Sequence, residues 1–396
     1  MHPFLLAAMT RRGGVFTTGD AVAAGHTRHG TAALVRAGRW RAVRYGVYTT
    51  DDLWQQHARA GRTHWLEAAA VLARLGRRST VLSHGTAARL HDLVLPRGVR
   101  TEVTATDPHR FRTGRDYRVL AAGIPAEDVE TFAPLPATSL RRTLLDVGRE
   151  WDVVDTVVAL DDALADGRIT LDQLTAGVLG QRHWVGVGSL ASAVRLARVG
   201  AHSPLETLTR LGLLTAGLPE PVLQAAVLRD GRLVAVLDLW WGGTPAFGET
   251  DGRVKWAQPW RGRSPADVGW DEKRRHDELL DLGLMGTRIT AADLGPGLAA
   301  KAARIRTLMT QPLRLPPGSA SSRGGTASAG NPVPARGRSR SRPMGGRSRS
   351  SATPVHPGQL MSAREDAQPS SQLIHAAGAA TRRGRCRRRR WRCGPG

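Results

Sequence analysis

The alternation of hydrophobic and polar residues predicts several short elements within the first 55 residues of the chain. We expect a helix over Gly19–Ala24, a turn at Gly25–His26 and a second helix over Thr27–Ala37, which Gly38 ends. The next segment, Trp40–Tyr48, is rich in strand-forming residues and predicts a hairpin. This order of helix, tight turn, helix and basic hairpin is typical of a winged helix-turn-helix. In that fold the second helix lies in the major groove of DNA.

The pattern of residues 60–185 mixes helical and strand spacing. THWLEAAAVLARLG and VVDTVVALDDALADG place apolar residues at helical intervals, whereas RTEVTATD and DYRVLAAG have the composition of strands. We therefore expect a mixed, mostly helical domain here. His84 and His91 are expected to be buried or capping residues, because no cysteine or paired acidic cluster accompanies them. The basic segment TDPHRFRTGRDYR is either a loop that contacts DNA or a solvated surface loop.

Residues 186–310 predict an α/β domain. A helix over VGSLASAVRLARVG is followed by a second one, in which Ser203 is the cap, Pro204 the first helical residue and Glu206 lies three residues after the cap. VLQAAVLRD, LVAVLDLWW and PAFGETDG predict three strands. Asp271 is expected to cap a helix through EKRRHDELLDLG, and a strand over LMGTRIT and a helix over LAAKAARIRTLM complete the domain.

Charge is spread unevenly along the 396 residues, whose formal net charge is +23. Residues 311–396 hold 17 Arg against Glu365 and Asp366, a balance of +15 that leaves +8 for residues 1–310. The tail is rich in Gly, Ser, Pro and Arg, and this composition predicts disorder. Such a tail would bind nucleic-acid backbones without sequence preference. An incidental tail without a selected role is the alternative.

Cysteine content and hydropathy indicate the compartment. The two cysteines, Cys386 and Cys393, both lie in the tail, so the body has no disulfide framework, which fits a reducing cytoplasm. No run approaches the ~18 apolar residues that a membrane span needs. The start of the chain lacks the basic leader of a signal peptide. We expect a soluble cytoplasmic protein with no membrane partner.

Basic side chains are concentrated on the second predicted helix and the hairpin of the first region. We expect phosphate or base contacts from six of them: Arg28, His29, Arg36, Arg39, Arg41 and Arg44. The alternative is a small helical subdomain whose arginines are merely solvated. The sequence therefore predicts double-stranded DNA as a partner.

Acidic residues in the third region lie in or beside apolar strands, where a carboxylate has to be paired or bound to a metal. Asp238 lies in the strand LVAVLDLWW, and Glu249 and Asp251 follow in the next strand. Each has a structural alternative. Glu206 fits a capping box, Glu249 and Asp251 fit a turn, and Asp238 fits an ion pair with Arg288 or Arg274.

Two segments of the first region, GGVFTTGDAVAAG and GRWRAVRYGVYTT, resemble the N-terminal domain of the AbiEi-like type IV antitoxins. VLSHGTAARLHDL and LPATSLRRTLLDVGRE resemble the central part of the same family. The resemblance implies a DNA-binding antitoxin or transcriptional repressor, with a cognate toxin that acts at gene level.

Residues 203–290 resemble the small restriction-endonuclease-like family related to very-short-patch-repair endonucleases. The similarity lies in SPLE, the VLDL strand, the ExDG step at Glu249–Gly252, KRRHDELLDLG and TRIT. This resemblance implies a PD-(D/E)xK nuclease core in which Glu206, Asp238 and Glu249 hold Mg²⁺. The implied catalytic residues are Asp238, Glu249, Asp251 and Lys255. Asp251 occupies the position of the usual lysine, and Lys255, four residues later, could substitute for it.

These expectations combine into an α+β multidomain protein. A winged helix over residues 1–55 precedes an antitoxin-like domain over 60–185, a nuclease-like α/β domain over 186–310 and a disordered tail over 311–396. The leading functional hypothesis is DNA binding of the antitoxin or repressor kind. The alternatives are a Mg²⁺-dependent DNA endonuclease targeted by the winged helix, and an interaction protein with the nuclease fold as scaffold.

Overall fold

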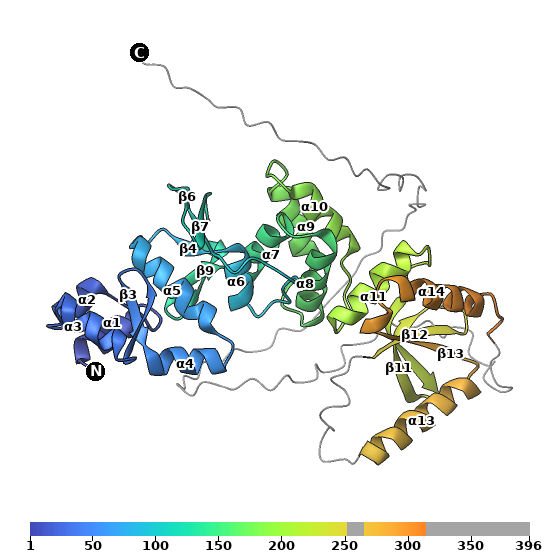
Figure 1. Ribbon diagram of the computed structural model, residues 1–396. Helices are drawn as coiled ribbons and strands as arrows, with labels where there is room; N and C mark the ends of the chain where they lie inside the picture. The colour runs from blue at the N-terminus through green and yellow to red at the C-terminus, as the bar shows by residue number, and fades with distance from the viewer. Residues whose placement is uncertain (252–264, 314–396) are drawn as a thin grey trace, which may run out of the picture. The chain divides into compact units, whose positions relative to one another are not determined.

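A computed structural model describes residues 1–251 and 265–313 and shows a mixed α+β protein with several sheets (Figure 1). The strand orders are β1-β3-β2, β6-β7-β5-β4-β9-β8 and β10-β11-β12-β13. Within the described residues, no helix is both long and apolar enough to cross a membrane. Lys255 and nearly all of the tail expected over 311–396 lie outside the described residues.

The N-terminal elements confirm the expected two helices and hairpin, with boundaries shifted by one or two residues. The elements are α1 (Pro3–Arg11), β1 (Phe16–Thr17), α2 (Thr18–Ala23), α3 (Arg28–Arg36), β2 (Trp40–Arg44), β3 (Val47–Thr50) and α4 (Asp51–Arg59). The sequence analysis did not predict α1, β1 or α4. Leu5, Phe16 and Trp40 centre a small core, in which the Phe16 and Trp40 rings meet edge to face at 4.7 Å.

The middle region contains a six-stranded mixed sheet as well as helices. Its elements are α5 (Thr63–Leu75), β4 (Val81–Leu82), α6 (His84–Leu90), β5 (Val103–Asp107), β6 (Arg112–Thr113), β7 (Tyr117–Ala121), η1 (Ala126–Asp128), β8 (Val129–Phe132), β9 (Leu135–Thr138), α7 (Leu140–Gly148), α8 (Val153–Ala165), α9 (Leu171–Gly180) and α10 (Val187–Leu196). The predicted helices α5 and α8 and the predicted strands β5 and β7 are confirmed. The emphasis on helix was too strong, because four strands of two to four residues were missed.

The C-terminal elements follow the predicted order of helix, three strands, helix, strand and helix. They are α11 (Pro204–Thr215), β10 (Val222–Arg229), β11 (Arg232–Trp240), β12 (Ala246–Asp251), α13 (Pro265–Asp281), β13 (Met285–Thr290), η3 (Ala291–Asp293) and α14 (Pro296–Met309). Ser203 caps α11 and Pro204 opens it, as expected. Asp271 is not the N-cap of α13, because that helix already begins at Pro265.

The four-stranded sheet of this region is covered on both faces (Figure 1). On one face Leu239 and Ile289 pack with residues of α11 and α14, and on the other Phe247 packs with Leu279 of α13. Helix α10 was assigned to this domain by the sequence, but its buried Ala193 belongs to the core of the middle region.

A buried ion pair joins the middle region to α11. The side chain of Arg210 is 0% exposed and donates to Asp161 of α8 at 3.2 Å and to Glu220 at 2.8 Å. Thr207 also donates to Asp161, at 3.0 Å. A buried charge is tolerated only when it is paired, so these contacts are required at this position.

Candidate nucleic-acid interface and acidic site

Local capping fixes the pair α2 and α3. Thr17 and Asp20 form a capping box at the start of α2, and Arg12 donates to Asp20 at 2.7 Å. The Thr27 side chain accepts from the backbone N–H of Gly30 and begins α3. The inner face of α3 packs through Thr31, which is buried. The orientation of α3 therefore follows from caps and packing inside the N-terminal core.

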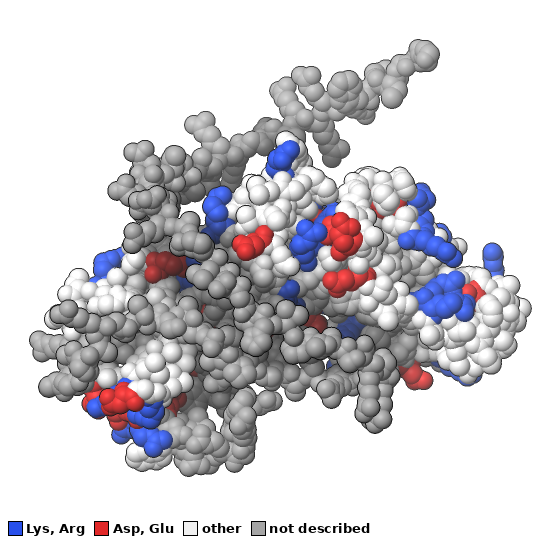
Figure 2. Space-filling model, turned by 180° about the vertical axis from the view of Figure 1, so that it is seen from behind, with Lys and Arg blue, Asp and Glu red and all other residues white. Residues whose placement is uncertain are grey.

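The outer face of α3 is basic and exposed. Its exposed residues are Arg28, His29, Ala32, Ala33 and Arg36. The helix contains no acidic residue. On the face drawn in Figure 2, Lys and Arg side chains gather over the N-terminal elements at the right, with acidic side chains interspersed. Three of the six expected DNA contacts thus lie on one accessible helix face.

The hairpin β2–β3 uses two of its expected DNA-contacting arginines internally. Arg41 donates through two N–H groups to Asp51, at 2.7 and 2.9 Å, and lies 5.2 Å from the centre of the Trp54 ring. Arg44 donates to Asp116 at 2.7 Å. Arg39 is exposed. Of the three hairpin arginines, Arg39 therefore has the most accessible position.

The expected catalytic acid Asp238 lies where β11 and β12 separate. The two strands pair at Leu239 with Gly248, but Asp238 then accepts from both the backbone N–H of Thr250 at 2.8 Å and its hydroxyl at 2.9 Å. The carboxylate takes the place of a ladder hydrogen bond. Neither Arg288 nor Arg274 is its partner in these contacts.

Glu206 is buried near Asp238 at the N-terminus of α11. It accepts from the N–H of His202, the hydroxyl of Ser203 and the amide of Gln224, each at 2.9 Å. The capping alternative holds only in part: Ser203 caps α11, but Glu206 holds the N–H of His202, the residue before the cap, so the expected capping box is not formed. Burial raises the pKa of Glu206, and the negative charge of Asp238 raises it further.

The backbone at this point is strained. Gln224 has φ 49°, a left-handed conformation that costs about 1–3 kcal/mol for a non-glycine residue. Its neighbours Leu223 and Ala225 pair with Leu239 and Leu237, so Gln224 lies opposite Asp238. Sequence reasoning assigned no contact with the acids to Gln224 or Thr250, although Thr250 stood out as a polar residue in an apolar strand. A polar residue between apolar strand positions was the available signal.

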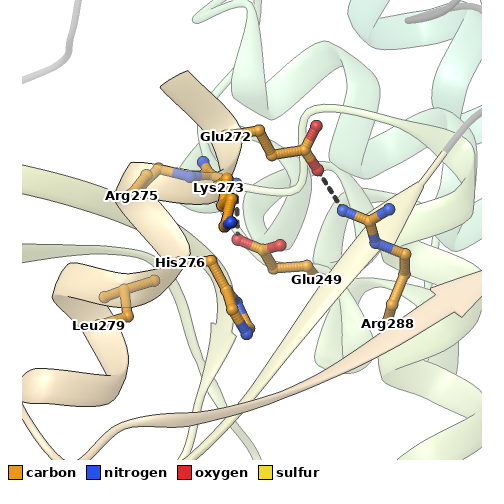
Figure 3. A pocket seen from close by; sticks show the side chains of 7 residues that line it. All are labelled: Glu249, Glu272, Lys273, Arg275, His276, Leu279 and Arg288. Atoms are coloured by element: carbon orange, nitrogen blue, oxygen red, sulfur yellow. Dashed lines mark hydrogen bonds and ion pairs between the residues drawn. The ribbon is translucent and has the colours of Figure 1, made fainter. Parts of the chain in front are cut away.

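Glu249 and Asp251 are engaged elsewhere, beside α13. Glu249 accepts from Arg275 at 3.0 Å, Asp251 lies 3.4 Å from Arg288, and Arg288 also pairs with Glu272. Glu249, Glu272, Arg275 and Arg288 line a hollow of about 300 Å³ together with Lys273, His276 and Leu279. Figure 3 shows these seven side chains. The two acids are balanced by arginine.

The described residues contain no cluster of three or more His, Cys, Asp or Glu that could hold a metal. Glu206 and Asp238 are close enough for their charges to interact, whereas Glu249 is paired with Arg275. The expected three-carboxylate Mg²⁺ set is therefore not assembled here. Two carboxylates and the amide of Gln224 are what this position offers to a hard cation.

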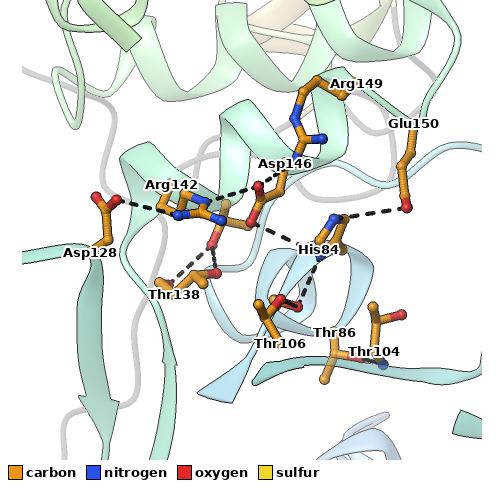
Figure 4. A network of polar contacts seen from close by, with 12 residues as sticks. His84, Thr86, Thr104, Thr106, Asp128, Thr138, Arg142, Asp146, Arg149 and Glu150 are labelled. Atoms are coloured by element: carbon orange, nitrogen blue, oxygen red, sulfur yellow. Dashed lines mark hydrogen bonds and ion pairs between the residues drawn. The ribbon is translucent and has the colours of Figure 1, made fainter. Parts of the chain in front are cut away.

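A second buried polar network surrounds His84 in the middle region (Figure 4). Its Nδ1 lies 2.9 Å from the Ser83 hydroxyl and 4.0 Å from Asp146, and its Nε2 lies 3.8 Å from Glu150. An acidic pair therefore does accompany this histidine, contrary to the sequence analysis. Burial lowers the pKa of His84, although Asp146 and Glu150 oppose that effect.

The His84 network is best explained as structural. Ser83 is 0% exposed and its hydroxyl also accepts from Thr106, so it is not an accessible nucleophile. Asp146 accepts from Arg142 at 2.9 Å and from Arg149 at 2.7 Å. His91 is hydrogen-bonded to the carbonyl of Thr138 at 2.8 Å. Both histidines are buried or half-buried, as expected.

A comparison with known protein-family models finds no match, and a comparison with curated proteins finds none either.

Proposed function

We propose that the protein binds double-stranded DNA through a winged helix-turn-helix formed by α2, α3 and the β2–β3 hairpin. The observation that carries this proposal is the outer face of α3, where basic side chains are exposed and the inner face is packed. Charges that no neighbouring acid neutralises remain available to phosphates. The resemblance to AbiEi-like antitoxins agrees with this function.

The spacing on α3 suits the major groove. Arg28 and Arg36 are eight residues apart, which is about 12 Å along a helix and is close to the groove width of ≈ 12 Å. Ala32 and Ala33 lie between them and let the helix backbone approach the bases. A methyl side chain can also contact the thymine methyl group.

A repressor role, with a cognate toxin controlled at gene level, is the biological form of this proposal. Its support is the family resemblance together with the exposed basic face of α3. A reporter gene placed behind the DNA that lies upstream of the protein's own gene tests this role. A repressor would lower its transcription, whereas a scaffold protein would leave transcription unchanged.

The direct test combines Arg28→Gln with Arg36→Gln. The log–log salt dependence of DNA affinity should become shallower by about two units, since each arginine is expected to neutralise one phosphate. The matched control combines Arg182→Gln with Arg195→Gln, two exposed arginines outside the N-terminal elements. An unchanged slope in the α3 variant would remove the support for this interface.

The second candidate is a Mg²⁺-dependent endonuclease in the C-terminal region, which we propose to have a PD-(D/E)xK-like core. The specific observation is the pair Glu206 and Asp238, whose charges repel at a strained, splayed part of the sheet. Bound Mg²⁺ would activate a water and offset charge on the phosphate. Glu206 and Asp238 would hold the ion, and Gln224 would orient Glu206.

Metal-dependent nicking of plasmid DNA tests the second candidate. Asp238→Asn should abolish cleavage and raise the Mg²⁺ concentration needed to stabilise the fold against heat, whereas Asp251→Asn should leave that stabilisation in place. Absence of cleavage together with no effect of Mg²⁺ or Mn²⁺ on the melting temperature of the wild type would end this candidate.

A further inference from the structure

A second basic hairpin projects from the sheet of the middle region. It is the β6–β7 hairpin, in which the short strand β6 pairs antiparallel with β7, and its projecting part covers residues 108–115. Its exposed basic side chains are His109, Arg110, Arg112 and Arg115, and Phe111 among them is 65% exposed. The preceding acid, Asp107, is buried and accepts from Ser79 and Thr80. The surface of the hairpin is therefore basic.

An ion pair and contacts with one aromatic ring hold this hairpin beside the turn of the β2–β3 hairpin. Arg44, the last residue of β2, donates to Asp116 at 2.7 Å. The guanidinium groups of Arg44 and Arg112 lie 5.0 and 5.9 Å from the centre of the Tyr117 ring. Tyr117 is thus a shared platform for one arginine from each hairpin.

The pairing of Arg44 with Asp116 has an electrostatic consequence. It neutralises Asp116 at the base of the second hairpin, and Asp116 therefore repels an approaching phosphate less. An ion pair at this position orients the two hairpins, while Arg110, Arg112 and Arg115 remain exposed. Arg44 then has a positioning role in place of the phosphate contact expected from the sequence.

Each hairpin exposes one aromatic ring next to arginine. Tyr45, at the turn that follows Arg44, is 88% exposed, and Phe111 lies between Arg110 and Arg112. Arginines that meet phosphates beside an aromatic ring that meets sugars or bases are a common combination at nucleic-acid surfaces. The same combination occurs twice here, on neighbouring hairpins.

We propose that residues 108–115 form a second DNA-contacting element, which binds the backbone of duplex DNA next to the part contacted by the β2–β3 hairpin. This inference rests on the proposed DNA-binding function and extends the interface into the middle region. The element would lengthen the bound stretch of DNA and add affinity for any sequence, because phosphate contacts carry no base information.

Photo-crosslinking tests the proposal directly in the full chain. Benzoylphenylalanine replaces Phe111 in one variant and Val185, a 91% exposed residue of the middle region, in the control. With a random-sequence duplex several helical turns long, position 111 should crosslink strongly and position 185 weakly. Equal yields at the two positions would overturn the proposal, as would stronger crosslinking of position 111 to RNA than to duplex DNA.

A salt titration provides the independent measurement. The combined variant Arg110→Gln, Arg112→Gln and Arg115→Gln should make the salt slope of duplex binding shallower by about two to three units. The matched control carries Arg182→Gln, Arg195→Gln and Arg304→Gln, which are exposed elsewhere and should change the slope much less. Equal slopes for the two variants would contradict the proposal.

The α3 variant separates the two possible failures. If Arg28→Gln with Arg36→Gln weakens binding but the hairpin variant does not, the second element is wrong and the proposed function stands. If both variants bind duplex DNA with unchanged slopes and position 111 does not crosslink, the proposed function fails as well.

Discussion

The outer face of α3 and the acid-rich sheet of the C-terminal region use charge in opposite ways. On α3, Arg28 and Arg36 are exposed, on a helix without acidic residues. In the C-terminal sheet, Glu249 and Asp251 are balanced by Arg275 and Arg288. Internal pairing stabilises a fold, whereas unneutralised surface charge attracts a partner. Sequence alone shows both sets as charged residues and cannot separate these uses.

The pair Glu206 and Asp238 is an exception within the C-terminal region. Both are acids, and the negative charge of Asp238 raises the pKa of Glu206. The hydrogen bonds that Glu206 accepts come from His202, Ser203 and Gln224, and those that Asp238 accepts come from Thr250, so all of these donors are neutral. The charge pattern therefore indicates Glu206 and Asp238 as the place to look for a functional site in the C-terminal sheet.

The largest expected effect comes from the most completely paired charge. Asp161→Asn removes the charge of the buried one of two acidic partners of Arg210, whose side chain is 0% exposed. We expect a loss of about 3–5 kcal/mol in the free energy of unfolding, because a buried guanidinium is left partly unpaired. Urea denaturation followed by tryptophan fluorescence measures this loss.

The matched control for that prediction is Asp166→Asn, which loosens a half-exposed pair with Arg168. It should cost no more than about 1 kcal/mol. If Asp161→Asn lowered the free energy of unfolding no more than this control does, buried ion pairs would not stabilise the fold as the contrast between the two regions assumes.

A smaller, pH-dependent effect is expected at Glu206. Its pKa is raised above the ordinary 4.5, mainly by burial and then by Asp238. A carboxyl whose pKa is raised by folding stabilises the protein fully below its unfolded pKa. That contribution is lost as the pH rises through the folded pKa. Stability from this group should therefore fall as the pH rises above about 4.5.

Melting temperatures of the wild type and Glu206→Gln across this pH range test the effect. The melting temperature of the variant should not fall as the pH rises. Altered hydrogen bonds to His202 could lower it, but by the same amount at every pH. Parallel curves for the two proteins would show that Glu206 does not carry an unrelieved charge. Addition of Mg²⁺ should flatten the wild-type curve if the second candidate function is correct.

Local signals predicted the order of elements well in two of the regions. The Ser203-Pro204-Glu206 sequence marked the start of α11, and apolar spacing located β10, β11 and β12. The middle sheet was harder, because β4 and β6 have two residues each and cannot show a period. β4 is placed by β5 and β9, which come much later in the chain, and β6 by the following strand β7.

The candidate sites depend on contacts that are remote in sequence. Arg44 meets Asp116, 72 residues away, and Gln224 reaches Glu206 across 18 residues. A basic residue on a predicted hairpin therefore looks like a phosphate contact until its acidic partner is known. The α3 face was easier to predict, since a single helix determines which of its residues are exposed.

The smallest expected change in stability is found by comparing two arginines of the N-terminal region, Arg41 and Arg36. Arg41→Gln should lower the free energy of unfolding by about 0.5–1 kcal/mol, because it removes a partly exposed ion pair with Asp51 and a contact with Trp54. Arg36→Gln should leave stability unchanged and weaken DNA binding instead, since its contact in the structure is with a carbonyl of its own helix. Thermal melts and DNA titrations on both variants measure the two quantities separately.

If Arg41→Gln weakened DNA binding as much as Arg36→Gln and left stability intact, Arg41 would release Asp51 on binding. Internal pairing would then no longer distinguish structural from DNA-contacting charges in this protein.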